Sequence, residues 1–457
     1  MPTLPLRNLV LLGVLAMLDG AAGAAEAEPA AAAGVGSGRP VGDPYLGLPS
    51  LSTEAPPPLL SQTGAFADLA TLKVVPALLP YEVNSPLWSD GARKQRWLAV
   101  PNRPDWDGAG SAISFSPTGE WYFPIGTVSM KEFDLPLDER DPSKVRRMET
   151  RFLVRADDVT VYGITYRWRD DQRDADLLDA GADQDVAVTL RDGSTRTQRW
   201  HYPSRAECLT CHNHTAGAFL GINTRQLNRA GRDGSPQLQK WNAMGLFGPP
   251  MPTERLAGLP HLTPPDDEHA DIAERARSYL DANCSHCHRP GAMPFNSYDA
   301  RFETPLARQN MINVRTFNDF GIEHACYIRA NDPWRSMILV RLDHLDLMKM
   351  PPLGRNLPDP LALTLMRAWI ASLDGRPALS PPTIAMSGHL ANGNATAEVR
   401  HADLQATLYY TIDGSAPDED GKRYTGPLHL TATGTLRVRA VRDGFADSIV
   451  VASPVVR

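Results

Sequence analysis

The chain has 457 residues, of which 42% are hydrophobic and 22% charged, and its formal net charge is −7. This length exceeds that of one ordinary domain, and the composition is that of a soluble globular protein with enough apolar residues to build cores. The net negative charge gives no reason to expect nucleic-acid binding, because that function needs a basic patch or stripe.

Residues 1–27 have the features of a secretory signal peptide. Arg7 supplies the positive charge, residues 9–18 form a short apolar segment, and small residues at 22–27 fit the cleavage pattern. About ten apolar residues are too few to cross a bilayer, which needs roughly 20. We therefore expect no membrane span and a periplasmic or otherwise exported protein. Residues 28–60, rich in Ala, Gly and Pro, are expected to be a disordered linker.

A β-rich domain is expected over residues 61–203. Its β-branched and aromatic residues concentrate in segments that Asp- and Gly-containing turns separate. These segments are residues 120–128, 151–155, 159–168 and 186–190. Asp192 and Gly193 predict a hairpin turn, and the second strand of that hairpin ends at Trp200.

The pattern then becomes helical. Ser204 followed by Glu207 is typical of a capping box at the start of a helix, within a segment spanning 204–265. Residues 266–283 carry apolar side chains at helical spacing, and a further helix is expected from Asp359-Pro360 to about Leu373. We therefore expect a helical domain over residues 266–376.

The chain beyond three prolines at 377, 381 and 382 alternates in the manner of a β-sandwich over residues 380–457. The expected fold class is multidomain α+β. Its parts are a β-rich N-terminal domain, a helical domain and a C-terminal β-sandwich.

Two C-x-x-C-H units carry the chemistry of this sequence. They are Cys208, Cys211 and His212, and then Cys284, Cys287 and His288. Such a unit is typical of covalent haem c attachment, in which two thiols add to the haem vinyl groups and the histidine ligates the iron. The alternatives are a C-x-x-C disulfide, or a zinc site if the two units pool their ligands. We expect two haems c, and the fifth cysteine, Cys326, is expected to be a buried structural residue.

The second axial ligand of each iron sets its potential and reactivity. Met350, between Lys349 and Pro351, is predicted to ligate the iron at His288, with Met348 as the rival residue. His212 has several candidates, and none is favoured over an open coordination position. They are Met244, Met251, His201 and Lys131.

Several segments together resemble a family of largely uncharacterised bacterial dihaem c-type cytochromes, over residues 65 to 375. The segments are 84–92 (NSPLWSDGA), 123–127, 149–151, 166–169, 203–208 and 221–228. Residues 268–375 also resemble a class I cytochrome c domain, through MPPLG at 350–354, Asp359 and Trp369-Ile370. A β-rich region that ends in a haem c unit is weakly similar to cytochrome P460. That likeness is the reason for including Lys131 among the ligands.

The C-terminal residues resemble the small β-sandwich at the end of chitobiases and β-hexosaminidases. The residues that carry this likeness lie at 408–417, 424–427 and 438–441. Such modules are accessory, so no sugar hydrolysis follows, and the resemblance implies a spacer or a docking module for a glycan or protein.

These features indicate an exported dihaem c-type cytochrome that transfers electrons between redox partner proteins. An alternative is a dihaem oxidoreductase, peroxidase- or oxygenase-like, with an open haem at His212. A third class is a surface protein that binds a polysaccharide or a partner through its C-terminal sandwich. Whether the protein is an enzyme is left open by the sequence.

Overall fold

The computed structural model describes residues 38–102, 111–293, 298–388, 395–418 and 421–455. The predicted signal peptide at 1–27 and the first part of the predicted linker lie outside these residues. The described part of the chain is mostly β, with 30% strand and 17% helix. The expected α+β class is therefore wrong. Within the described residues, no helix is long and apolar enough to span a membrane.

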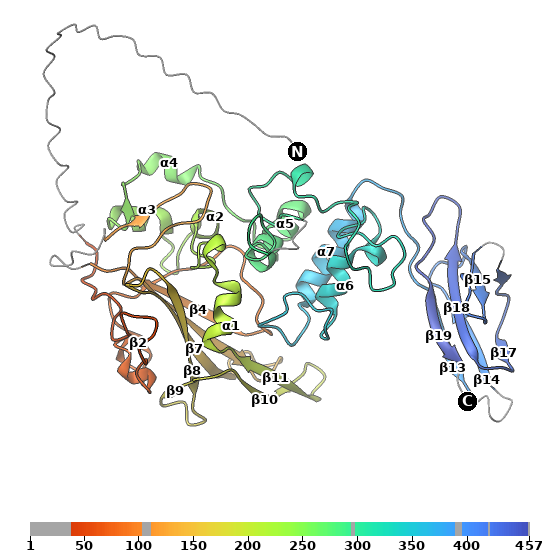
Figure 1. Ribbon diagram of the computed structural model, residues 1–457, viewed down its shortest axis with the longest axis horizontal. Helices are drawn as coiled ribbons and strands as arrows, with labels where there is room; N and C mark the ends of the chain where they lie inside the picture. The colour runs from red at the N-terminus through yellow and green to blue at the C-terminus, as the bar shows by residue number, and fades with distance from the viewer. Residues whose placement is uncertain (1–37, 103–110, 294–297, 389–394, 419–420, 456–457) are drawn as a thin grey trace, which may run out of the picture. The chain divides into compact units, whose positions relative to one another are not determined.

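A six-stranded antiparallel sheet forms the centre of the N-terminal part of the chain (Figure 1). Residues alternate between its two faces along each strand. On one face Trp97, Met130, Phe152 and Ile164 belong to a buried apolar cluster. The strand order is β3 (Leu79–Pro80), β4 (Arg93–Ala99), β6 (Val128–Pro136), β7 (Val145–Arg155), β8 (Val161–Trp168) and β9 (Ala175–Leu177).

Residues 38–60 differ from the expected disordered linker. Tyr45, Leu48 and Leu60 are buried against the same apolar face of the sheet. A high content of Pro and Gly does not prevent packing when apolar side chains stand between them, because burial of those side chains opposes the loss of chain entropy.

The predicted strand at 120–128 is also absent from the described structure. Glu120 and Tyr122 make only single bridges, to Asn223 and Ser114. Pro124 lacks a backbone N–H, and Gly126 has a positive φ of 84°, so this segment cannot continue a regular ladder. The predicted hairpin around Asp192-Gly193 is confirmed as β10 (Ala182–Thr189) paired with β11 (Thr195–Tyr202).

The second face of the central sheet carries helix α1 (Arg205–Cys211), which lies against β8. Gly163 of β8 makes this close approach possible. A Cβ added at Gly163 would lie 2.7 Å from Cβ and 2.8 Å from Sγ of Cys208. Gly163 therefore sets how deeply the first C-x-x-C-H unit lies on the sheet.

A second apolar cluster contains Trp121, Trp241 and Phe247. The elements that contribute to it are β5 (Ile113–Ser114), α2 (Thr224–Leu227), α3 (Gln237–Ala243), β12 (Phe247–Gly248) and α4 (Thr253–Ala257). The short strands β1 (Phe66–Asp68) and β2 (Lys73–Val74) instead pack against the first apolar cluster.

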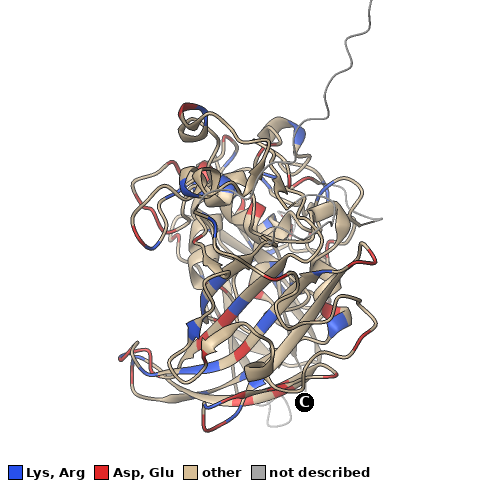
Figure 2. Ribbon diagram, turned by 90° about the vertical axis from the view of Figure 1, so that its left-hand side faces the viewer, with Lys and Arg blue, Asp and Glu red and all other residues tan. Residues whose placement is uncertain are grey.

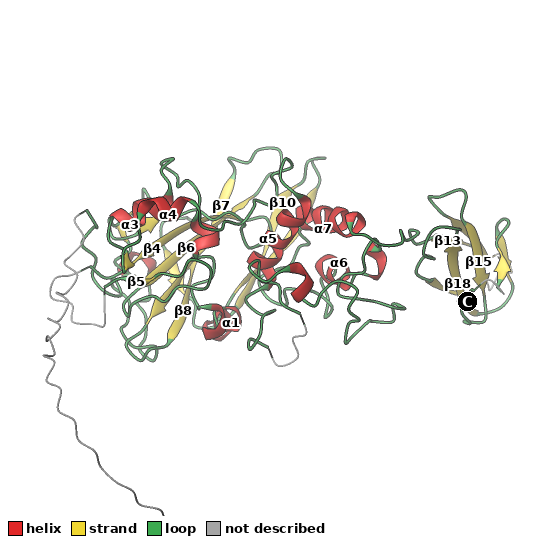
Figure 3. Cartoon of the chain, turned by 90° about the horizontal axis from the view of Figure 1, so that it is seen from above, coloured by secondary structure: helices red, strands yellow, loops and turns green. Residues whose placement is uncertain are grey.

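The expected helical cytochrome c domain at 266–376 is wrong, although two of its helices are present. They are α5 (Ile272–Cys284) and α7 (Pro360–Ser372), which pack together, and a shorter α6 (Met337–Asp343) lies between them in the sequence. Figure 3 shows these helices as separate segments joined by long loops. The loop before α6 holds five residues with positive φ, a conformation that interrupts helices. These are Asn310, Asn313, Phe320, His324 and Asn331.

The C-terminal residues form two sheets over one apolar core, as the alternation predicted. The core includes Ala397, Leu436 and Val438, each fully buried. One sheet has the order β13 (Thr383–Ser387), β14 (Ala395–Arg400), β17 (Leu428–Leu430). The other has the order β16 (Lys422–Arg423), β15 (Thr407–Thr411), β18 (Gly434–Val441), β19 (Val451–Val455).

Substitution of Gly163→Ala tests the contact between α1 and the sheet. We expect it to destabilise the protein by about 1–3 kcal/mol, the usual range for overpacking, as measured by urea unfolding followed by circular dichroism. Gly258→Ala is the matched control, because Gly258 has φ −87° and no atom within 4 Å of an added Cβ. If the two variants unfold at the same urea concentration, Gly163 does not set the position of α1.

Candidate functional site

The first C-x-x-C-H unit is positioned by a capped helix. The backbone N–H of Glu207 donates to the Ser204 hydroxyl at 3.2 Å, and that of Ser204 donates to the Glu207 carboxylate at 2.8 Å. This reciprocal pair is the predicted capping box and defines the start of α1. Cys208 and Cys211 then lie about one helical turn apart, and His212 follows at the end of the helix.

The His212 ring is held in one tautomer. Its Nδ1 lies 2.6 Å from the carbonyl oxygen of Ala218, which can only accept, so Nδ1 carries the proton and Nε2 the lone pair. Burial, with a further contribution from Lys131, lowers the pKa of His212 to about 3. The ring is therefore neutral at pH 7. A neutral imidazole whose second nitrogen donates to a carbonyl is the usual state of a metal-ligating histidine.

The second C-x-x-C-H unit begins in the last turn of α5. The helix is capped by Asp271, whose carboxylate accepts from the backbone N–H groups of Ala273 and Glu274. The backbone N–H of His288 donates to the carbonyl of Cys284 at 2.8 Å, which continues the turn beyond the helix. The His288 ring stacks on Tyr298, with ring centroids 4.2 Å apart and planes 14° apart.

The two units lie next to one another, although the contact between them joins residues 73 positions apart in the chain. The side-chain amide of Asn213 donates to the carbonyl of His286 at 3.0 Å and to that of Cys211 at 3.3 Å. Burial raises the pKa of the Cys211 thiol to about 11, and the proximity of Cys287 contributes. Asn213, which directly follows the first unit, thus connects that unit to the second one by hydrogen bonds.

A buried ion network fixes this arrangement. The Arg225 Nε donates to both oxygens of Asp281 at 3.0 Å, and its Nη2 donates to Glu120 at 2.9 Å. Arg289, which directly follows His288, donates to the same Glu120 oxygen at 3.0 Å. The side chains of Arg225 and Asp281 are each 3% exposed. Since Asp281 lies on α5, this network connects α2 and Glu120 to both sides of the second unit.

The electrostatics of Glu120 are consistent with this network. Burial alone would raise the pKa of its carboxyl, but Arg225 and Arg289 outweigh that effect and lower it. The carboxylate is therefore charged at neutral pH, as the two guanidinium groups require.

Residues 84–92, the NSPLWSDGA segment, connect the β-rich region to the second unit. The backbone N–H of Trp88 donates to the Asn283 side chain at 2.8 Å, next to Cys284. The Asp90 carboxylate accepts from the backbone N–H groups of Asn356 and Leu357 at 2.8 Å. This segment therefore touches α5 and the loop that follows Met350.

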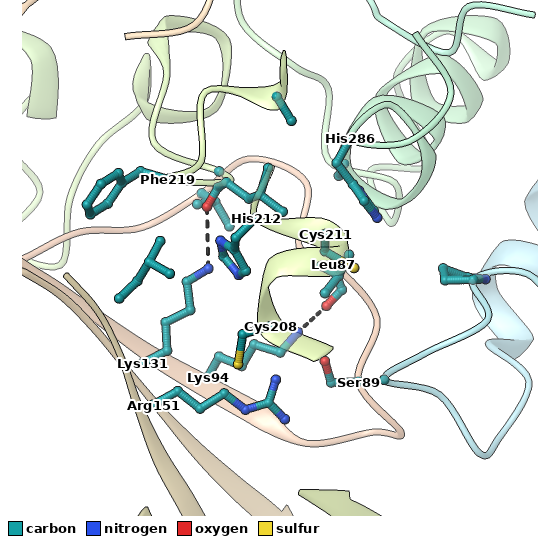
Figure 4. A pocket seen from close by; sticks show the side chains of 18 of the residues that line it. Leu87, Ser89, Lys94, Lys131, Arg151, Cys208, Cys211, His212, Phe219 and His286 are labelled. Carbon is teal, nitrogen blue, oxygen red and sulfur yellow. Dashed lines mark hydrogen bonds between the residues drawn. The ribbon is translucent and has the colours of Figure 1, made fainter. Parts of the chain in front are cut away.

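A cavity opens between α1, the sheet and α5, and Figure 4 shows side chains that line it. Cys208, Cys211 and His212 face it, together with His286 of the second unit. Its sheet wall is cationic, because it carries Lys94, Arg96, Lys131 and Arg151. Figure 2 shows that the strands bear charged residues of both signs.

These cations form a row across three strands. The register places Arg96 of β4 opposite Lys131 of β6, and Lys131 opposite Arg151 of β7. Lys94 lies two residues before Arg96, so it belongs to the same face. Burial and the nearby Arg96 and Arg151 lower the pKa of Lys131 to about 7. Burial, followed by the same guanidiniums and Lys131, lowers the pKa of Lys94.

Of these four residues, only Lys131 was considered a site residue from sequence. The spacing of Lys94 and Arg96 at alternate strand positions was a signal that both face one side. Nothing in the sequence indicated that Arg151, 20 residues beyond Lys131, is its cross-strand partner, because register is set by the whole sheet.

The candidate second ligands for an iron at His212 have different surroundings in the structure. Met244 and Met251 pack against the apolar cluster of Trp121 and Trp241. His201 lines the cavity, but its two ring nitrogens contact Asp183 at 2.7 Å and Glu207 at 3.1 Å. Lys131 lies in the cavity beside His212 and donates to the carbonyl of Leu220 at 3.4 Å (Figure 4). Lys131 is therefore the candidate that the structure brings to His212.

Met350 lies on a loop tied to α6. Its backbone N–H donates to the carbonyl of Arg341 at 3.0 Å, and the Arg341 side chain donates to the carbonyl of Met348 at 3.2 Å. The Arg341 guanidinium also acts electrostatically on Tyr298, the residue that stacks on His288. Met348 and Met350 therefore share neighbours with the second unit.

All five cysteines are free thiols. Cys326 is fully buried, as expected for a structural residue. Burial raises the pKa of Cys284 to about 12, so this thiol is protonated at neutral pH. Across the described ranges, no group of three or more His, Cys, Asp and Glu side chains is arranged to hold a metal ion.

Comparison with known proteins finds a similarity in the C-terminal part of the chain. Residues 387–452 match the chitobiase/beta-hexosaminidase C-terminal domain. This match covers most of the two-sheet sandwich described above and agrees with the predicted resemblance. No curated protein matches the chain.

The residues around the first unit fit a haem c. Two thiols and a neutral imidazole with a fixed tautomer face one cavity, and the cationic wall suits the carboxylates of haem propionates. Cys208 and Cys211 would hold the macrocycle, and His212 Nε2 would ligate the iron. At the second unit Cys284, Cys287 and His288 offer the same donor set, with Tyr298 against the imidazole.

The ion network predicts a large effect of Arg225→Met. We expect the free energy of unfolding to fall by about 3–5 kcal/mol, because Asp281 and Glu120 would lose their buried partner. Guanidinium unfolding followed by circular dichroism measures this loss. Arg199→Met is the control, since its ion pair with Asp185 is exposed and contributes at most about 1 kcal/mol. Equal losses in the two variants would contradict a central role for Arg225.

Proposed function

We propose that this chain is an exported c-type cytochrome that carries two covalently attached haems c and transfers electrons between redox partner proteins. The observation that carries the proposal is the pairing of the two C-x-x-C-H units. His212 has its Nδ1 bonded to a carbonyl, and Asn213 joins its unit to the second one. Neighbouring units suit transfer of an electron from one site to the other.

The residues of the chain have distinct roles in this proposal. Cys208, Cys211, Cys284 and Cys287 would hold the haem vinyl groups as thioethers, since addition of an S–H across a vinyl double bond forms an S–C and a C–H bond with nothing released. His212 and His288 would each supply a nitrogen to an iron. Haem c itself supplies an iron that gains and loses one electron. Met350 is proposed as the second ligand at His288, on the strength of its loop contacts with Arg341.

A dihaem oxidoreductase is the second candidate function, because three of the candidate second ligands for an iron at His212 are engaged elsewhere. Met244 and Met251 pack against the apolar cluster of Trp121, and His201 contacts Asp183 and Glu207. A catalytic haem needs an open position that a small molecule can reach, and Lys131 would then lie beside that position without ligating the iron. A His212 haem that stays low-spin and ignores cyanide and carbon monoxide would exclude this candidate.

Export and docking complete the proposal. Residues 1–27 are proposed to direct the chain to the periplasm. The C-terminal sandwich is proposed to be an accessory module, a spacer or a docking site for a glycan or protein, since a fold of this kind does not by itself imply hydrolysis.

Mass spectrometry of the purified protein tests haem attachment. We expect the wild-type chain to carry two haems. The double substitutions Cys208→Ala/Cys211→Ala and Cys284→Ala/Cys287→Ala should each remove one, because each removes both thiols of one unit. Cys326→Ala is the matched control and should retain both haems.

A wild-type polypeptide without added mass would overturn the proposal. Electron transfer is tested separately by redox titration of the holoprotein. If neither haem is low-spin and six-coordinate, the carrier function fails even when both haems are attached.

A further inference from the structure

The cavity in front of His212 has an unusual charge for this chain. Seven basic side chains and three carboxylates line it, so basic groups outnumber acidic groups by four, while the whole chain has a net charge of −7. The cations are Lys94, Arg96, Lys131, Arg151, Arg225, Arg289 and Arg355, and the carboxylates are Glu120, Glu207 and Asp281.

The three carboxylates of the lining are already engaged. Glu120 binds both Arg225 and Arg289, and Asp281 binds Arg225. Glu207 caps α1 and contacts His201. Arg151 has a carboxylate partner in Glu149, at 2.5 Å. The basic groups without a carboxylate partner in the lining therefore lie mostly on the sheet wall, and Arg355, which donates to backbone carbonyls, lies on the loop after Met350.

Lys94 and Lys131 make their hydrogen bonds with neutral groups. Lys94 donates to the carbonyl of Leu87, and Lys131 donates to the carbonyl of Leu220 at 3.4 Å. A carbonyl orients an ammonium group but does not neutralise its charge.

The arrangement of these cations is unfavourable without an anion. Like charges directly opposite on adjacent strands destabilise a sheet, and Arg96, Lys131 and Arg151 are opposite one another in turn. Buried charges without opposite charges are costly as well. A bound anion would relieve both effects.

We propose that Lys94, Lys131 and Arg151 form a binding site for an anionic oxygen group, a carboxylate or an inorganic oxyanion, in the cavity in front of His212. The Nε and Nη2 of Arg151 donate to Glu149, so Arg151 offers its remaining N–H groups, and the ammonium groups of Lys94 and Lys131 suit oxygens from other directions. The oxygens come either from a propionate of the haem at His212, which rests on the proposed function, or from a free oxyanion that reaches the open face of the site.

Two measurements on the full-length holoprotein distinguish these sources. The first is thermal unfolding in increasing inorganic phosphate at constant ionic strength. A free-oxyanion site gives a saturable rise in melting temperature, because a ligand that binds only the folded state stabilises it. The second is the reduction potential of the haem at His212. A propionate site gives no phosphate effect, but loss of a cation shifts this potential to a more negative value.

The variants are Lys94→Gln, Lys131→Gln and the matched control Lys73→Gln, whose side chain is exposed on β2. For a free oxyanion, Lys131→Gln weakens phosphate binding at least tenfold and Lys131→Arg restores it. For a propionate, both cavity variants lower the potential and Lys73→Gln leaves it unchanged.

The proposal is overturned if phosphate has no saturable effect and the cavity variants have the potential of the control. Failure of the proposed function is a different result. A chain without attached haem gives no added mass, yet its cavity still reports phosphate binding through thermal unfolding.

Discussion

The buried ion network of Arg225 is the interaction on which the rest of the site depends. One guanidinium binds Asp281 on α5 and Glu120 near the sheet, and Glu120 in turn binds Arg289 beside His288. A buried ion pair adds little to the free energy of unfolding compared with apolar packing. Its geometry is nevertheless closely constrained, because displacement of one partner leaves the other as an unpaired buried charge. The network therefore specifies where the second C-x-x-C-H unit lies.

Around this network the chain brings distant segments to one place. Residues 84–92 reach α5 through Trp88 and the loop after Met350 through Asp90. Asn213 joins the first unit to the second. Each of these contacts uses backbone groups that would otherwise lack partners, which explains why short polar motifs rather than apolar ones connect the parts of the site.

The central sheet serves the site through its two different faces. One face is apolar and builds the core, whereas the other receives α1 at Gly163 and places a row of cations beneath it. The alternation of strand residues allows both in the same strands, since Lys131 follows Met130 and Arg151 precedes Phe152. The basic side chains of this row therefore all lie on the face that carries α1, where they line the cavity.

The sequence by itself determined the features that are local. The two C-x-x-C-H units, the Ser204–Glu207 capping box, the Asp192-Gly193 hairpin and the C-terminal sandwich each depend on residues a few positions apart or on simple alternation. Helical periodicity also located α5 and α7. This periodicity did not reveal the long loops between the two helices. The loops depend on residues with positive φ, such as Asn313 and Asn331, and positive φ leaves no periodic pattern in a sequence.

Only the tertiary structure decided how these features are combined. The contact of Asn213 with His286, the Arg225 network and the row of Arg96, Lys131 and Arg151 depend on strand register and on packing between segments far apart in the chain. A shift of one residue in register would turn the row to the apolar face. Register is set by the burial of all the strands together, and no single strand contains that information.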